Sequence, residues 1–185
     1  MLAIAIKKVA LSDIESLQKI SKKTFFDTFS PSNTEANMQR YLNEQFSKEQ
    51  LTAELNNSNS AFYFAVLDNN IIGYLKLNTG QAQTELQDAG ALEIERIYVL
   101  QAFHGKKAGQ VLYEKAIQIA TDQNAPYIWL GVWEENKRAI RFYEKNGFTA
   151  FGTHIFRLGN DVQTDLLMRK KLIPDPLKAD QQLAV

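Results

Sequence analysis

The sequence predicts a single α/β domain built on a mixed, mostly antiparallel sheet of about seven strands, flanked by about four helices. Segments rich in β-branched and aromatic residues recur between segments of helical periodicity. The 185 residues, 45% of them hydrophobic, suffice for one ordinary core, and no internal repeat or second domain is discernible. We expect the domain to span residues 1–172 and residues 173–185, which are polar with two prolines, to form a loosely ordered tail.

The first half of the chain is predicted to contain a strand, two helical regions and a hairpin. The strand covers residues 2–9, and Ser12 or Asp13 caps the helix that follows. The remaining elements follow in order: a break at residues 30–33, a helical region from Thr34 to about Leu55 interrupted at Ser47, a polar loop at residues 56–60, and a hairpin of residues 61–67 and 71–77.

The second half alternates strands with helices and ends on a strand pair. Leu92–Leu100 is a strand rich in β-branched and aromatic residues, and a short glycine loop joins it to a helix. The other expected elements are a mostly apolar strand at residues 127–132 with both faces covered, a helix between Asn136 and Asn146–Gly147, and strands at residues 148–156 and 164–172 joined by a turn at residues 159–161.

Composition excludes several classes of function. Lysine plus arginine equals aspartate plus glutamate, 21 each, and this zero net charge argues against broad binding of nucleic acid or anionic membranes. The absence of cysteine rules out a disulfide, a cysteine nucleophile and a thiolate metal site. Only His104 and His154 are present, without a metal-ligand pattern, so no metal is expected.

No segment is long enough to span a membrane, and the apolar start is too short for a signal peptide. A soluble, cytoplasmic protein is therefore expected. An oligomer is possible, but nothing in the sequence indicates one.

The glycine loop at residues 104–109 is the first candidate site. A glycine loop that leads into a helix presents unpaired backbone N–H groups and the positive end of the helix dipole, which together favour phosphate. Lys106 and Lys107 add positive charge there. The alternative interpretation is that Gly105 and Gly109 only make a tight turn.

The order of elements, together with the run from Asn136 to Phe148, resembles the Gcn5-related N-acetyltransferase (GNAT) family. The resemblance covers residues 4–172, nearly the whole chain. It implies a GNAT-like fold, acetyl-CoA as co-substrate, a small-molecule amine as acceptor, and direct attack of the amine on the thioester in a ternary complex. Such an enzyme needs no metal.

The loop departs from the family pattern of Gln or Arg, two residues, Gly, one residue, then Gly or Ala. His104 replaces the Gln or Arg, and Lys107 replaces the first Gly. A lysine with positive φ costs about 1 kcal/mol relative to glycine. The loop length is unchanged, so the N–H groups that bind pyrophosphate should remain.

The resemblance also implies which residues bind the coenzyme. Backbone groups of Ile97 and Val99 would hydrogen-bond the pantetheine arm, and Asn136 would contact that arm from the next helix, or act only as a helix cap. The full expected set is Ile97, Tyr98, Val99, His104, Gly105, Lys106, Lys107, Ala108, Gly109, Gln110, Asn136 and Lys145.

Acetyl transfer needs a base for the amine and an acid for the departing thiolate. Tyr143 occupies the family's tyrosine position and is assigned as the acid; its alternative role is that of a core aromatic. Glu95 is the preferred base and Glu93 the second candidate. If the strand is regular, both carboxylates share one face, and each could instead be a solvated carboxylate or a partner of Arg96.

At subfamily level the chain resembles the PaiA-like bacterial spermine/spermidine acetyltransferases. The matching stretches are residues 25–33, 73–78, 83–85 and 129–134. A polyamine favours carboxylates and aromatic faces. Phe29, Glu85, Trp133 and Glu134 are therefore candidate acceptor-binding residues, beside Glu93 and Glu95; core aromatics and surface carboxylates are the alternative.

Other enzyme classes lack their motifs. The loop does not end in the Gly-Lys-Ser/Thr of a P-loop, and the chain has neither an early dinucleotide-binding Gly-x-Gly-x-x-Gly nor a Gly-x-Ser-x-Gly elbow. Two alternatives stay open. One is an acetyltransferase of protein N-termini or lysine side chains, and the other is a non-catalytic module that binds acetyl-CoA and regulates a partner.

Overall fold

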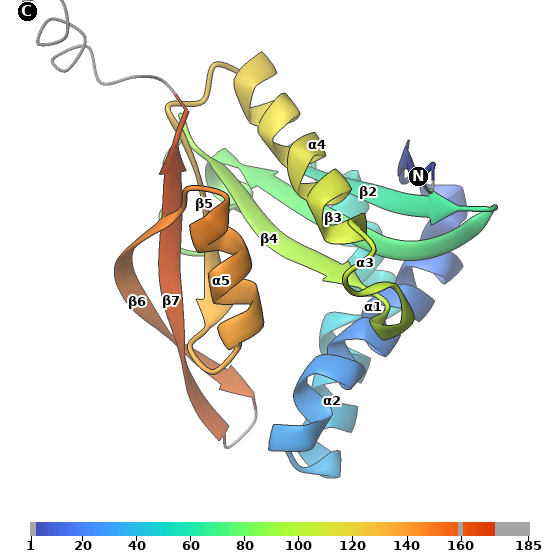
Figure 1. Cartoon of the computed structure of the whole chain (residues 1–185). Helices are drawn as coiled ribbons and strands as arrows, with labels where there is room; N and C mark the ends of the chain where they lie inside the picture. The colour runs from blue at the N-terminus through green and yellow to red at the C-terminus, as the bar shows by residue number, and fades with distance from the viewer. Residues whose placement is uncertain (1–2, 159–160, 173–185) are drawn as a thin grey trace, which may run out of the picture.

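A seven-stranded sheet in the order β1-β2-β3-β4-β5-β7-β6 forms the centre of the protein. The computed structural model describes residues 3–158 and 161–172 (Figure 1). The strands are β1 (Ala5–Lys8), β2 (Ser60–Leu67), β3 (Asn70–Thr79), β4 (Leu92–Val99), β5 (Tyr127–Trp133), β6 (Thr149–Leu158) and β7 (Asp161–Lys171). Every neighbouring pair is antiparallel except β4 and β5. The predicted mixed, mostly antiparallel α/β architecture is therefore confirmed.

Five α-helices lie among the described residues, where about four were predicted. The predicted break at Ser47 is confirmed, because its Oγ accepts a hydrogen bond from the Gln50 N–H at 3.0 Å and caps a separate helix. The helices are α1 (Ile14–Phe29), α2 (Glu35–Gln45), α3 (Lys48–Asn56), α4 (Ala108–Asp122) and α5 (Lys137–Lys145). The predicted tail, and residues 159–160 of the predicted turn, lie outside the described residues.

The helices divide between the two faces of the sheet. Helices α1, α2 and α3 cover one face, over a core that includes Phe46, Phe62 and Tyr74. Helices α4 and α5 cover the other, over a core that includes Leu112 and Ile128. We call these the α1–α3 face and the α4–α5 face. The apolar strand β5 separates two buried layers, as its sequence predicts.

The β2–β3 hairpin forms as predicted. Asp68 and Asn69 both have positive φ, 48° and 63°, which Asp and Asn tolerate better than most residues. Positive φ at both central residues is the geometry of a type I′ turn, whose twist matches that of the flanking strands. The hairpin thereby fixes the register that carries β3 to its other neighbour, β4.

Strands β4 and β5 separate soon after they meet. They pair only at Leu92 with Ile128 and at Glu93 with Trp129, while β4 stays paired with β3 as far as Val99. In Figure 1 the two strands diverge from this point. The backbone edges that face each other beyond the two pairs are not joined by sheet hydrogen bonds. We call the region where β4 and β5 are no longer hydrogen-bonded to each other the opening.

A β-bulge interrupts β4 next to the opening. Lys76 pairs with Arg96 and Leu77 with Ile94, so Glu95 is the extra residue. Glu95 and Arg96 consequently point to the same face, where both contact side chains under α3. The regular alternation assumed from the sequence is wrong at Arg96. Glu93 and Glu95 do share one face, as predicted for them.

Candidate active site

The first turn of α4 has backbone N–H groups with no capping side chain. Lys107 is the N-cap residue, and a lysine side chain has no hydrogen-bond acceptor. Its φ is 66°, so the strain foreseen for a lysine in this position is present. Ala108, Gly109 and Gln110 form the first turn, and their N–H groups point out of the helix end. This geometry suits an anion.

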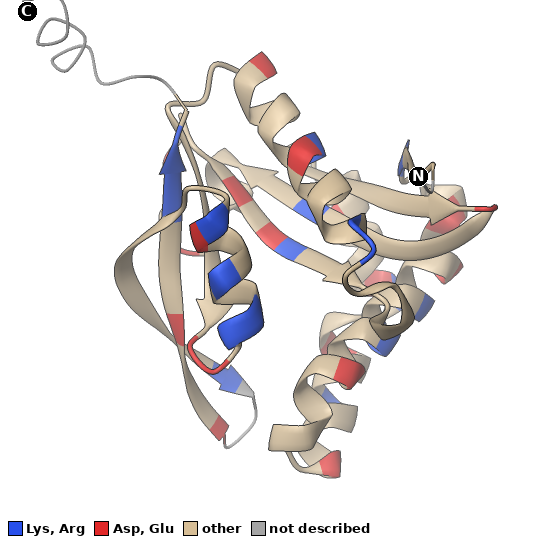
Figure 2. Ribbon diagram, viewed as in Figure 1, with Lys and Arg blue, Asp and Glu red and all other residues tan. Residues whose placement is uncertain are grey.

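The loop before α4 is open and basic. Gly105 has a φ of 75°, and a Cβ there would meet no atom within 4 Å. Lys106 and Lys107 are exposed, and the Lys106 ammonium lies 5.2 Å from the centre of the Phe103 ring. In Figure 2 the blue of this loop faces the blue of α5. Lys145 is exposed on the last turn of α5.

The edge of β4 that borders the opening carries free backbone groups. The Leu100 N–H donates to the Ile72 carbonyl on the β3 side, at 2.9 Å. Backbone groups alternate along a strand, so those of Ile97 and Val99 face the opening. The Tyr98 backbone faces β3, and its ring stacks on Tyr74. On this edge the Val99 carbonyl accepts a hydrogen bond from His104 Nε2 at 2.8 Å, whereas no described residue is hydrogen-bonded to the backbone of Ile97 from this side.

Asn136 caps α5 at the opposite side of the opening. Its Oδ1 accepts a hydrogen bond from the Ala139 N–H at 3.1 Å. Asn136 therefore acts as a helix cap, which is one of the two roles expected for it. Because the cap uses only the side-chain oxygen, the amide nitrogen is available for a ligand.

Tyr143 is the buried residue of α5. Its ring centre lies 5.4 Å from that of Phe142 and 5.6 Å from that of Phe148, within the core of the α4–α5 face. Burial raises the pKa of its hydroxyl above the ordinary value. No other described residue lies within hydrogen-bond distance of that hydroxyl. It is therefore a protonated phenol with a free donor.

Glu95 belongs to a buried polar network on the α1–α3 face. Its carboxylate lies 2.6 Å from Lys76 Nζ and 2.9 Å from an Arg96 guanidinium nitrogen, and Glu54 binds the same two cations. Despite the burial that opposes it, the charges of Arg96 and Lys76 lower the pKa of Glu95. A carboxylate held in the charged form by two cations is a weak base for an ammonium group.

Glu93 lies in the same network without a cation of its own. Its carboxylate accepts from the Thr84 backbone N–H at 3.0 Å, from the Thr84 hydroxyl, and from Asn78 Nδ2 at 3.0 Å. Burial, together with the nearby Glu95 charge, raises the pKa of Glu93, although the hydrogen bonds oppose the shift. Of the two strand carboxylates, Glu93 is therefore closer to the properties of a general base.

An acidic and aromatic surface borders the opening on the α1–α3 face. Trp133 packs on Phe29 of α1, with ring centres 5.8 Å apart, and lies opposite Asp165 of β7. Asp165 in turn lies opposite His154, whose Nε2 is 2.9 Å from Glu85 Oε1. We call Phe29, Glu85, Trp133, Glu134, His154 and Asp165 the acceptor surface.

Asp165 has no ion-pair partner among the described residues. Burial raises its pKa to about 6, and the charges of Glu134 and Glu85 add to this while His154 opposes it. Gly131 leaves space beside it: Gly131 is exposed, although its neighbours Leu130 and Val132 are buried. A partly buried carboxylate next to an empty strand position is suited to bind or deprotonate an ammonium group.

The site thus brings together residues that were predicted separately and adds two that were missed. Glu85, Trp133 and Glu134 lie at one surface, whereas Phe29 is buried in the core behind Trp133. Asp165 and His154 were not among the candidates, because single polar residues in a strand carry no local functional signal. They come together because His154 and Asp165 are direct partners in the pairing of β6 with β7, which the sequence does not specify locally.

Two faces of the sheet therefore present complementary chemistry. The first turn of α4 and the unpaired edge of β4 lie on the side of the α4–α5 face, and the Tyr143 ring is buried in the core of that face. The carboxylates and aromatic rings lie on the α1–α3 face.

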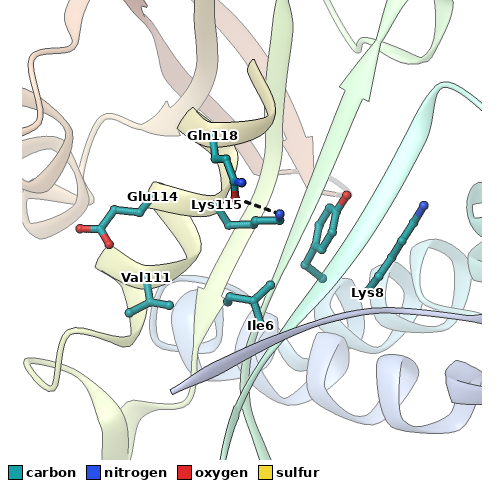
Figure 3. Close-up of a pocket in the computed structure, with 7 residues that line it drawn as sticks. Ile6, Lys8, Val111, Glu114, Lys115 and Gln118 are labelled. Atoms are coloured by element: carbon teal, nitrogen blue, oxygen red, sulfur yellow. Dashed lines mark hydrogen bonds between the residues drawn. The ribbon is translucent and has the colours of Figure 1, made fainter. Parts of the chain in front are cut away.

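A separate hollow lies away from this site. It has a volume of about 600 Å³ and is lined by residues of β1, β2 and α4, among them Ile6, Lys8, Tyr63 and Lys115 (Figure 3). Lys115 Nζ donates to Gln118 Oε1 at 3.0 Å. None of the candidate catalytic residues lines this hollow.

Neither a membrane-spanning helix nor a metal centre is found in the part of the chain that the structure describes. None of its helices is long and apolar enough to cross a membrane. In the same ranges, no three His, Asp or Glu side chains are grouped so that they could hold a metal ion.

Comparison with known proteins identifies the arrangement. The profile of the acetyltransferase (GNAT) family matches residues 15–148. An N-acetyltransferase of Lactobacillus delbrueckii subsp. lactis is 38% identical over 173 residues, which is 94% of this chain and 100% of that protein. The spermidine N(1)-acetyltransferase of Thermoplasma acidophilum is 26% identical over 174 residues, or 92% of this chain and 98% of that protein.

A solved structure agrees with these relatives. The crystal structure of the PaiA N-acetyltransferase from Thermoplasma acidophilum in complex with coenzyme A superimposes with a TM-score of 0.77. It is 26% identical in sequence, and the match covers 92% of this chain and 100% of that one.

Proposed function

This chain belongs to the GNAT family of acetyltransferases and is an acetyl-CoA-dependent N-acetyltransferase, and we propose that its acceptor is a primary amine of a polyamine such as spermidine or spermine. The acceptor surface is the observation that carries the proposal. Three carboxylates, Glu85, Glu134 and Asp165, gather there; His154 lies beside Glu85, and the Lys137 ammonium donates to the Glu134 backbone carbonyl. Such a surface favours a ligand with several positive charges.

Aromatic side chains complete the acceptor surface. Trp133 is partly exposed next to the carboxylates and packs on the buried ring of Phe29, and an ammonium group is attracted to the face of an aromatic ring. The relationship to the spermidine acetyltransferase of Thermoplasma acidophilum supports the same acceptor class. An extended polyamine would place one amine at the opening and its distal ammonium groups against this surface.

The proposed reaction is a direct transfer in a ternary complex. The amine lone pair attacks the thioester carbonyl carbon, the C–S bond then breaks, and coenzyme A leaves as a thiolate. The ammonium proton goes to a carboxylate, for which Asp165 and Glu93 have the raised pKa values that a base needs. Glu95 is better suited to bind Lys76 and Arg96 in the buried network than to accept the proton of the ammonium group. With no cysteine in the chain, a cysteine-bound acetyl intermediate is excluded.

Tyr143 is proposed as the acid. Its burial keeps the phenol protonated, and its hydroxyl is free to donate to the departing thiolate. A thiol has an ordinary pKa near 8.5, so a phenol with a higher pKa donates a stabilising hydrogen bond or the proton itself. The oxygen of the thioester would be stabilised by the N–H groups on the free edge of β4.

The test is release of coenzyme A from acetyl-CoA in the presence of spermidine, spermine or a lysine-containing peptide. The proposal expects release that depends on the polyamines, with a higher kcat/KM than for the peptide. Faster release with the peptide would replace the polyamine by a protein acceptor. Tight acetyl-CoA binding without release for any amine would favour the non-catalytic module.

A further inference from the structure

His104 joins the two sides of the opening through its imidazole ring. His104 Nε2 lies 2.8 Å from the Val99 carbonyl oxygen, at the end of β4. Its Nδ1 lies 2.6 Å from Arg138 Nη1, and Arg138 is in the first turn of α5. β4 and α5 belong to the halves of the protein that diverge at the opening. One side chain therefore touches both halves beside the loop that leads into α4.

The two contacts define the protonation of the ring. A carbonyl oxygen only accepts hydrogen bonds, so Nε2 must carry the hydrogen that His104 donates to Val99. Arg138 only donates, so Nδ1 must accept. The ring thus donates through Nε2 and accepts through Nδ1. His104 then binds the guanidinium through Arg138 Nη1; Arg138 Nη2 lies 3.5 Å from Nε2, the nitrogen that donates to Val99.

Arg138 has no carboxylate partner among the described residues, although it is exposed on a helix that carries Glu144. It points instead to a loop that already contains two lysines. Figure 2 shows this concentration of positive charge on α5 and the facing loop. Cations that gather without a counter-ion create a positive potential that attracts an anionic ligand. The free N–H groups of the first turn of α4 lie at the same loop.

We propose that Arg138 is a ligand of the coenzyme's phosphate groups and that His104 is the residue that positions it. The guanidinium plane suits a phosphate, because two parallel N–H donors match two of its oxygens. His104, which departs from the family's loop pattern, then has a function. It accepts a hydrogen bond from Arg138 and holds the guanidinium group next to the loop of residues 104–109. The proposal rests on the use of acetyl-CoA and is independent of the acceptor.

The experiment compares ligands with and without phosphates. Dissociation constants for coenzyme A and KM values for acetyl-CoA and acetyl-pantetheine, which lacks the phosphates, are measured for the wild type, Arg138→Gln and Arg141→Gln. We expect Arg138→Gln to weaken coenzyme A binding about tenfold and to leave the KM for acetyl-pantetheine unchanged. Arg141 is an equally exposed cation of α5, and its loss should have a much smaller effect, which separates a specific contact from net charge.

The positioning role has its own variants. His104→Asn shortens the side chain that accepts from Arg138, and it should weaken coenzyme A binding by less than Arg138→Gln does. The double variant should be no weaker than Arg138→Gln alone, because the two residues act through one contact. Arg138→Lys keeps the charge without the planar fork and should bind coenzyme A with intermediate affinity.

Two results would overturn the proposal. One is a dissociation constant for coenzyme A that Arg138→Gln leaves unchanged. The other is an equal loss for acetyl-CoA and acetyl-pantetheine, which would indicate a general structural role. Thermal unfolding of each variant identifies misfolding, and in that case Arg138→Lys supplies the comparison. A wild type that binds coenzyme A but acetylates no polyamine would refute the proposed acceptor and leave this inference standing.

Discussion

Asp165 of β7 lies diagonally across from Gly131 of β5, whose direct partner in the strand pairing is Leu167. A Cβ at position 131 would lie 3.7 Å from Asp165 Oδ2, on the face of the sheet where the acceptor surface lies. Leu130 and Val132, the neighbours of Gly131 in β5, point to the α4–α5 face, so the bare strand position leaves the Asp165 carboxylate open to the α1–α3 face. The proposed binding of the acceptor amine depends on this free space beside the Asp165 carboxylate.

Ionisation of Asp165 should appear in the pH dependence of catalysis. Its pKa is raised to about 6, so kcat/KM for spermidine should rise as pH increases through that value. Asp165→Asn should abolish this rise and lower kcat/KM at pH 7, while leaving the dissociation constant for acetyl-CoA unchanged. Steady-state measurement of kcat/KM for spermidine between about pH 5 and 8, a range that brackets the raised pKa of Asp165, checks this prediction. A rise that survives in Asp165→Asn would exclude this residue.

The same residue makes a prediction for stability. Between its ordinary pKa of 3.8 and its folded pKa of about 6, the native state binds more protons at Asp165 than the unfolded state does. This contribution to the free energy of unfolding therefore decreases as pH rises through that interval. Asp165→Asn should be more stable than the wild type at pH 7 and lose that advantage at pH 4. Urea unfolding at both pH values measures the difference, and equal differences would contradict the assignment.

A larger side chain at position 131 should obstruct the acceptor. The nearest atoms to a Cβ there are 3.7–3.9 Å away, which is ordinary contact distance, so Gly131→Ala should fold normally. Gly131→Leu should project over Asp165 and raise the KM for spermidine without changing the dissociation constant of acetyl-CoA. An increase in the dissociation constant of acetyl-CoA without an increase in the KM for spermidine would mean that the acceptor binds elsewhere.

Removal of the Tyr143 hydroxyl should slow the transfer step. Tyr143→Phe keeps the ring packing and should lower kcat at least about tenfold, which corresponds to about 1.4 kcal/mol of transition-state stabilisation. The dissociation constant of acetyl-CoA should stay close to that of the wild type. Tyr63→Phe, on β2 at the separate hollow, is the matched control and should retain full activity. An unchanged kcat in Tyr143→Phe would assign the residue to the core alone.

The buried network around Glu95 should matter for stability. Lys76→Met leaves Glu54 and Glu95 with one cation fewer in a buried site, and such losses cost about 3–5 kcal/mol. The exposed pair of Lys23 and Asp27 supplies a control, since Lys23→Met should change the free energy of unfolding by less than about 1 kcal/mol. Urea unfolding of both variants measures this, and a cost as small as that of the control would contradict the account.

Most of the fold was predictable because its signals are local. The hairpin is specified by two strands and a short Asp-Asn-Asn turn, and the start of α5 by the capping residue Asn136. The split of the second helical region is specified by Ser47, which caps α3. Each of these features depends on residues a few positions apart.

The parts that escaped prediction depend on distant partners. The bulge at Glu95 is created by the register between β3 and β4, and Glu95 itself looks like an ordinary alternating residue in the sequence. Its ion pairs with Lys76 and Arg96, which argue against the preferred base, exist only once that register is known. Asp165 likewise becomes conspicuous only when β7 pairs with β5 beside Gly131.

In the proposed complex, acetyl-CoA and a polyamine meet at the opening from opposite faces of the sheet. A bisubstrate conjugate, in which spermidine is linked through an acetyl bridge to the sulfur of coenzyme A, tests it most directly by its dissociation constant. We predict that the conjugate binds the wild type at least about a hundredfold more tightly than coenzyme A does, and that Gly131→Leu removes most of the gain. A conjugate that binds no more tightly than coenzyme A itself would contradict the account.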